Sequence, residues 1–247
     1  MERRIYRLAL AAAAAVLSAA PLHAQSQPRL TVAVSGGYQP TTTAFDDSFQ
    51  FTVNRENGSS RVDYGVDAGS LFDGGFGVRL WRGLGAGVAF SYFRVDGNVH
   101  ATSSVPHPFE FQRLREISGD AGGIRREEKA VHIQAQYLLR PFARVQVTVM
   151  GGPSILDINQ TVVTRVTHTE EYPYDTAAFA RVDSRRVTGT KTGFNAGADL
   201  RWMFARHLGA GGVVRYTQAP IDLRVDDRRI RVDAGGAHVG AGIRIVF

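Results

Sequence analysis

The chain has 247 residues, a net charge of +6 and no cysteine. The lack of cysteine excludes a disulfide framework and a thiolate site. The moderate positive charge, without a basic cluster interleaved with aromatic residues, argues against a nucleic-acid partner. No metal-binding or cofactor-binding pattern is found, and we therefore expect no metal and no cofactor.

The first 24 residues have the pattern of a cleaved secretory signal peptide. Arg3, Arg4 and Arg7 form a basic start, an apolar run covers 8–20, and Leu22-His23-Ala24 resembles a cleavage site. The apolar run is too short for a membrane-spanning helix, which needs about 20 residues. We predict cleavage after Ala24, leaving one domain over 25–247 with a net charge of +4.

Segments with period-two alternation of apolar and polar residues follow, which is typical of β-strands. The pattern predicts eight strands, at about 29–39, 68–81, 84–96, 129–139, 144–156, 189–204, 207–218 and the C-terminal segment. Three of the connections are tight, around 81–84, 139–144 and 204–208. The other four are long and polar, at 40–67, 97–128, 157–188 and 219–234. In an antiparallel arrangement the short turns meet at one rim and the long connections at the other.

The last strand ends on a phenylalanine, and its alternation is clear. Phe247, Ile245 and Ile243 share one face, whereas Arg244, Gly242 and Gly240 share the other. Because termini normally fray, a strand that runs to the last residue suggests that this end is tied into a closed sheet.

The export signal, the terminal Phe strand and the loop asymmetry together resemble the small eight-stranded bacterial outer-membrane β-barrels (OmpA-, OmpX- and OmpW-like). The resemblance covers nearly the whole mature chain. It implies an all-β, transmembrane, up-and-down antiparallel barrel in the outer membrane, with short periplasmic turns and long extracellular loops. It also implies contact with outer-membrane lipid and lipopolysaccharide. The assembly machinery would recognise Phe247, Ile245 and Ile243, and we expect a monomer.

The alternation itself leaves open which face looks inward, and a soluble secreted barrel with an apolar interior is the alternative. Small and polar residues on one face, and aromatic residues near strand ends, favour the membrane arrangement. The lumen would then hold a polar network drawn from all parts of the chain: Asp73, Arg79, His132, Gln134, Asp199, Arg201, Arg215 and Arg244.

Two functions compete for this lumen. An eight-stranded barrel is only wide enough for its own side chains, which favours a structural or surface-interaction barrel whose lumen is plugged by paired charges. The alternative is a narrow channel for small or anionic solutes, since the lumenal arginines outnumber the aspartates.

An outer-membrane hydrolase is the third possibility, and we predict that the protein is not an enzyme. The His-x-Ser signature of lipid A deacylases is missing at His132. The acidic pairs Asp46-Asp47 and Asp226-Asp227 have no identifiable histidine–aspartate partner. The loop histidines His100, His107 and His168 are interpreted as exposed loop residues. The second and third loops, 97–128 and 157–188, carry exposed aromatic residues near arginines, and we interpret these two segments as β-hairpins that extend the strands beyond the membrane. The alternative is that these residues contact a partner or the phosphates of lipopolysaccharide.

Overall fold

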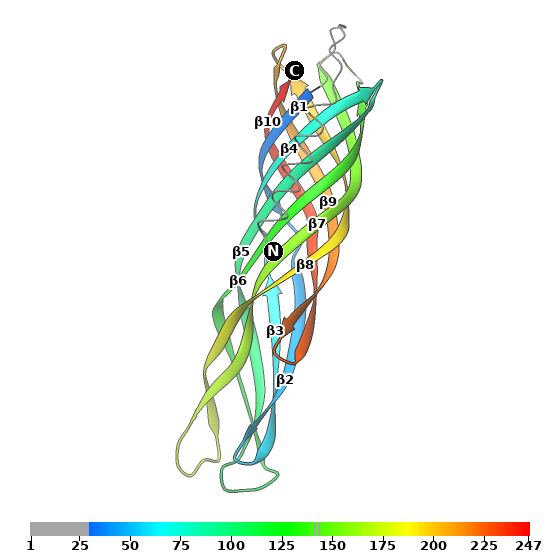
Figure 1. Cartoon of the computed structure of the whole chain (residues 1–247). Helices are drawn as coiled ribbons and strands as arrows, with labels where there is room; N and C mark the ends of the chain where they lie inside the picture. The colour runs from blue at the N-terminus through cyan, green and yellow to red at the C-terminus, as the bar shows by residue number, and fades with distance from the viewer. Residues whose placement is uncertain (1–29, 141, 143) are drawn as a thin grey trace.

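The computed structural model describes residues 30–140, 142 and 144–247, and the predicted signal peptide lies outside them. The described chain folds into antiparallel strands, many of which run most of the length of the molecule (Figure 1). They are β1 (Leu30–Gln39), β2 (Thr43–Val53), β3 (Glu56–Val66), β4 (Gly69–Trp81), β5 (Leu84–Pro106), β6 (Leu114–Leu139), β7 (Val145–Glu170), β8 (Ala177–Met203), β9 (Leu208–Val225) and β10 (Arg228–Val246). In this part of the chain, no helix has the length and apolar character required to cross a bilayer.

Eight of these strands close into a ring. The order is β1-β4-β5-β6-β7-β8-β9-β10, and β10 pairs with β1 to complete it. The closure extends to the last residue, because the amides of Leu30 and Phe247 each donate to the carbonyl of the other, at 3.0 and 2.9 Å. The predicted eight-stranded, antiparallel up-and-down barrel is confirmed.

The remaining two strands, β2 and β3, form a hairpin in the connection between β1 and β4. β3 pairs with the far part of β5, from Ser59 opposite Ser104 to Tyr64 opposite Val99. β5 thus changes its partner: β4 pairs with it as far as Arg94, and β3 takes over beyond. The short strands β1 and β4 are in this way continued by a second pair.

The prediction that 40–67, 97–128, 157–188 and 219–234 are long loops is wrong, because most of each segment is strand. For 97–128 and 157–188, the interpretation as hairpins that prolong the barrel describes the structure better. At the extended end, only the short connections 54–55, 107–113, 171–176 and 226–227 join the strands. Along these segments, polar side chains that point outward alternate with apolar side chains that point inward. Continued strand pairing therefore buries the apolar side chains and satisfies the hydrogen-bonding groups of the backbone.

β9 shows an inversion of polarity along one strand. Its outward side chains change from apolar, at Leu208, Ala210, Val214 and Tyr216, to polar, at Gln218, Asp222 and Arg224. Its inward side chains change in the opposite sense, from Arg215 and Thr217 to Ala219, Ile221, Leu223 and Val225, which are all buried. The strand parity is constant throughout, so the surroundings of the strand change rather than its orientation.

The inversion lies at the same height on neighbouring strands. Tyr92 of β5 stands opposite Lys129 of β6, and Lys129 stands opposite Asp157 of β7. On the short-turn side of this level, the exposed side chains are apolar and aromatic, as in Val214, Ile133 and Phe194. The apolar part of β9, from Leu208 to Tyr216, spans about 20–25 Å at barrel tilt, which matches the apolar band of an outer-membrane barrel. We call this outward apolar surface the belt, and the part of the molecule beyond it the extended half.

The extended half is filled by a hydrophobic core of its own. Val62, Tyr64, Ile158, Ile221 and Leu223 are each at most 1% exposed and belong to one continuous cluster. The hydroxyl of Tyr64 accepts a hydrogen bond of 2.8 Å from the backbone N–H of Val163, so its polar end is satisfied inside this core. Burial raises the pKa of Tyr64 to about 12. The interior of the molecule is therefore polar within the belt and apolar within the extended half.

Candidate functional site: a polar lumen and an exposed tip

The lumen inside the belt receives every second side chain of the ring strands. All eight residues predicted for the polar network project inward. Of these, Asp73, His132, Gln134, Arg201, Arg215 and Arg244 are buried, while Arg79 and Asp199 are partly exposed. The residues come from β4, β6, β8, β9 and β10, and the constant strand parity brings them to one interior.

Two ion pairs connect distant strands across the lumen. Arg215 of β9 forms a two-pronged contact with the carboxylate of Asp73 on β4, and both side chains are almost fully buried. Arg244 of β10 donates from Nε and Nη2 to Oδ2 of Asp199 on β8, at 2.8 and 2.6 Å. Its Nη1 also donates to Oγ of Ser35, at 2.9 Å. Charge-assisted pairs of this kind fix the relative position of the strands that carry them.

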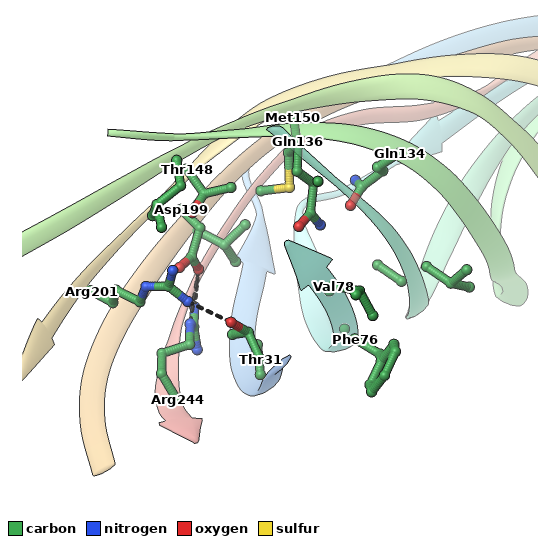
Figure 2. Close-up of a pocket in the computed structure, with 18 of the residues that line it drawn as sticks. Thr31, Phe76, Val78, Gln134, Gln136, Thr148, Met150, Asp199, Arg201 and Arg244 are labelled. Carbon is green, nitrogen blue, oxygen red and sulfur yellow. Dashed lines mark hydrogen bonds and ion pairs between the residues drawn. The ribbon is translucent and has the colours of Figure 1, made fainter. Parts of the chain in front are cut away.

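Arg201 is a buried lumenal arginine that forms no ion pair with the described residues, in contrast to Arg215 and Arg244. Its Nη1 donates to Oγ1 of Thr31 at 3.0 Å, whereas its buried Nε has no hydrogen-bond partner (Figure 2). The residue is 5% exposed. A buried guanidinium with an unsatisfied donor is energetically costly and calls for an explanation.

A second set of contacts joins the middle of the lumen. His132 Nε2 lies 3.0 Å from Ser91 Oγ, and its Nδ1 lies 2.8 Å from Ser154 Oγ. Asn195 Nδ2 donates to the same Ser154 oxygen, and Gln134 Nε2 donates to Asn195 Oδ1, both at 2.8 Å. This chain links β5, β6, β7 and β8, and His132 at its centre is fully buried.

The lumen contains a cavity of about 80 Å³. Gly83, in the turn between β4 and β5, forms part of its wall, so the cavity lies toward the short-turn end. Figure 2 shows Arg201, Arg244, Asp199 and Thr148 on one side, with Gln134 and Gln136 across from them. A single water molecule needs about 10–15 Å³ of such space, so the cavity has room for a small polar guest.

A buried ion pair marks the transition from the polar lumen to the apolar core. Arg126 Nε donates to Oε1 of Glu128 at 2.6 Å, and Glu128 Oε2 accepts from the backbone N–H of Gly235 at 2.8 Å. Arg126 Nη2 donates to the carbonyl of Asp233. These residues tie β6 to β10 at the level where the interior changes from polar to apolar.

The tip of the extended half is an exposed aromatic cluster on two connected turns. Phe109 and Tyr174 meet edge to face at 5.4 Å between ring centroids, and Tyr172 packs on Tyr174. Arg115 holds the turns together, because it donates to the carbonyls of Tyr174 and Pro106, both at 2.9 Å. Tyr172 and Phe109 are nevertheless 86% and 75% exposed.

The side chains considered for hydrolysis from the sequence are engaged in other contacts. Asp47 is buried and lies 2.7 Å from Arg228, and Asp226 lies 2.9 Å from Arg185. His107 accepts from the turn amides of Phe109 and Glu110. Its position is thus buried in a turn, contrary to the expectation of an exposed loop residue. His100 pairs with Asp120, and His168 lies 3.8 Å from Glu170. Among residues 30–140, 142 and 144–247, no three histidine or acidic side chains are grouped as metal ligands.

Sequence reasoning missed several partners of the lumenal network. Thr31, Ser35, Ser91, Ser154 and Asn195 were not singled out, although each is on the inward parity of its strand. Their signal is that parity combined with a small polar side chain. The three residues predicted as an assembly signal lie at the barrel seam, where Ile243 and Ile245 stand opposite Val34 and Val32.

A family model described as outer membrane protein beta-barrel domain matches residues 9–244. A search of curated proteins finds no match to the chain.

Several solved structures are similar. Neisserial surface protein A is 11% identical with a TM-score of 0.42, covering 88% of this chain and 97% of its own. The outer-membrane protease OmpT of Escherichia coli is 8% identical with a TM-score of 0.49, covering 92% and 99%. The attachment invasion locus protein Ail of Yersinia pestis, solved with the heparin analogue sucrose octasulfate, is 15% identical with a TM-score of 0.36, covering 88% and 99%.

Proposed function

Since this chain belongs to the outer membrane protein β-barrel domain family, we propose that it is a closed structural and surface-interaction barrel of the bacterial outer membrane. The belt contacts lipid, the polar lumen stabilises the wall, and the extended half projects from the cell. The signal peptide over 1–24 is removed on export, and the Phe247 strand directs assembly of a monomer. The short turns face the periplasm.

The observation that carries the proposal is the change of the interior from polar to apolar. A conducting path would have to pass the Arg126–Glu128 pair and then the core around Ile158, Ile221 and Leu223, in which these side chains are at most 1% exposed. Protein interiors packed in this way leave few voids larger than a water molecule. This supports a plugged lumen over the narrow anion channel.

The tip supports the interaction role. Exposed aromatic rings such as Tyr172 and Phe109 are costly to leave in water and are enriched where proteins meet partners. Arg115 and the ion pair between Arg113 and Asp175, at 2.9 Å, fix the two turns that carry the rings. A tip ordered before binding loses less conformational entropy on contact.

We propose that the barrel is not catalytic. The engagement of Asp47 by Arg228 and of Asp226 by Arg185 supports this, because a general base needs a lone pair directed at a reacting group.

Planar-bilayer conductance of the purified protein tests the closed lumen. The wild type should give no stable current steps at neutral pH and moderate salt. Heat-modifiable gel mobility should be measured on the same sample to show that the barrel is folded. Stable, anion-selective steps that Arg201→Ala weakens would overturn the proposal in favour of the channel.

A further inference from the structure

The charges around the lumenal cavity do not balance. Four arginines and two aspartates line it: Arg79, Arg201, Arg215, Arg244, Asp73 and Asp199. Both carboxylates are engaged, one by Arg215 and the other by Arg244. Arg201 forms no ion pair with either carboxylate or with any other acidic side chain in the described part of the chain.

At Arg201, the excess of arginine over aspartate coincides with a buried N–H group that has no acceptor in the described structure. Among the described residues, its buried Nε has no hydrogen-bond partner, and its Nη1 donates to Thr31 Oγ1. Figure 2 shows its guanidinium at the edge of the cavity, beside Asp199 and facing Thr31. Uncompensated charge in such surroundings is unfavourable, and an anion within the cavity would remove the penalty.

The rest of the wall offers neutral hydrogen-bonding groups and space. Gln136 projects into the lumen beside Gly77 and Gly87, where a Cβ would collide with its amide group. The hydroxyl of Thr148 and the amide of Gln134 also line the cavity. A guanidinium presents several N–H donors in a planar fork that matches an oxyanion better than a spherical ion.

From these observations, we propose that the cavity is a binding site for a small inorganic oxyanion, with phosphate or sulfate as the chemical class. Arg201 supplies the charge and the unsatisfied donor, and the amides of Gln134 and Gln136 and the hydroxyl of Thr148, which also line the cavity, complete the shell. Because the apolar core of the extended half closes the lumen, the site holds the anion and offers it no path through the barrel. The inference concerns the same lumen as the proposed closed barrel, but conductance tests that function and anion binding tests this one.

Titration calorimetry of the folded protein, in detergent free of lipopolysaccharide and phospholipid, tests the site. Inorganic phosphate should bind saturably at one site per chain, at constant ionic strength. Arg201→Gln should weaken binding by about 10- to 100-fold, the loss expected for one charge-assisted hydrogen bond. The matched control is Arg186→Gln, which removes an exposed arginine from β8 that does not line the cavity, and it should bind as the wild type does.

A second variant keeps every charge. Gly75 lines the cavity, and a Cβ there would make ordinary contacts of 3.6 Å with Ala89 Cβ and 3.9 Å with Val88 O. Gly75→Ala should therefore fold and should reduce phosphate binding by filling space, which keeps the test decisive if Arg201→Gln does not fold. Absence of saturable binding to the wild type would overturn the site. Equal binding to the wild type and to the folded variants would also overturn it, since that outcome indicates an adventitious ion only.

Discussion

Removal of one partner from the Arg215–Asp73 pair should destabilise the barrel strongly. The two side chains are 3% and 7% exposed and join strands β9 and β4 across the lumen. Asp73→Leu leaves the guanidinium of Arg215 buried without its counter-charge, and such changes cost about 3–5 kcal/mol. Arg215→Met leaves the carboxylate in the same position, at a similar cost. The double variant removes both charges, and we expect its stability to lie within about 1–2 kcal/mol of the wild type.

The assay is equilibrium unfolding in urea, with the protein inserted in lipid vesicles. Trp81 and Trp202 are 62% and 52% exposed on the belt, so their fluorescence reports the loss of lipid contact. The expected coupling energy between the two substitutions exceeds about 3 kcal/mol. An exposed pair on β3, Arg61 with Asp63, serves as the control and should show a coupling below about 1 kcal/mol. Additive single variants that each cost less than about 1 kcal/mol would refute the role of the pair in stabilising the wall.

Three further predictions concern the core, the belt and the seam. Burial raises the pKa of Tyr64 to about 12. The contribution of its neutral form to the free energy of unfolding should therefore be fully present below pH 10, and the free energy of unfolding should fall by up to about 3 kcal/mol as the pH rises toward 12. Tyr64→Phe should remove this alkaline loss in a pH-dependent unfolding series, while costing about 1–2 kcal/mol at pH 7 because the amide of Val163 loses its acceptor. Val214→Arg, in the belt, should cost about 2–4 kcal/mol in vesicles. Asp222→Arg lies beyond the inversion on the same face and opposite Arg231, so it should cost less than about 1 kcal/mol, the scale of one cross-strand charge pair. Equal effects would contradict the assignment of the belt. Phe247→Asp should lower the yield of membrane-inserted protein in cells, measured by fractionation, far more than Asn98→Asp at an exposed position of β5. Equal yields of the two variants would count against the terminal strand as an assembly signal.

The membrane part of the fold could be predicted from the sequence because two independent signals agree. The belt residues of strands such as β9 are apolar at every second position, and tight turns separate consecutive strands. The pairing of Asp73 with Arg215 and of Asp199 with Arg244 could not be predicted, because each partner set depends on registers between strands that are far apart in the chain. The eight residues predicted for the lumen were selected by inward parity together with a charged, histidine or glutamine side chain, and these two signals need no knowledge of the registers.

The extended half contains the four segments that were predicted as long loops, of which 97–128 and 157–188 were also interpreted as hairpins. In 219–225 the apolar residues Ile221, Leu223 and Val225 alternate as clearly as those in the belt, but on the opposite face. A search for one apolar face per strand stops where that face becomes polar, and it therefore ends β9 at Thr217 or Gln218. The polarity inversion is readable in the sequence once both faces are followed across the boundary.

The inversion level also determines how far the molecule reaches. Sliding the barrel along the membrane normal would bring Lys129 and Asp157 into hydrocarbon on one side, or Val131 and Ile155 into water on the other. The insertion depth is therefore fixed to within the rise of about two strand residues, roughly 5–7 Å. β5 continues for 14 residues from Tyr92 to Pro106, which at barrel tilt is a height of about 35 Å. The aromatic tip is thus held at a constant distance from the bilayer surface, beyond the reach of the lipid headgroups, by the same strands that anchor the protein.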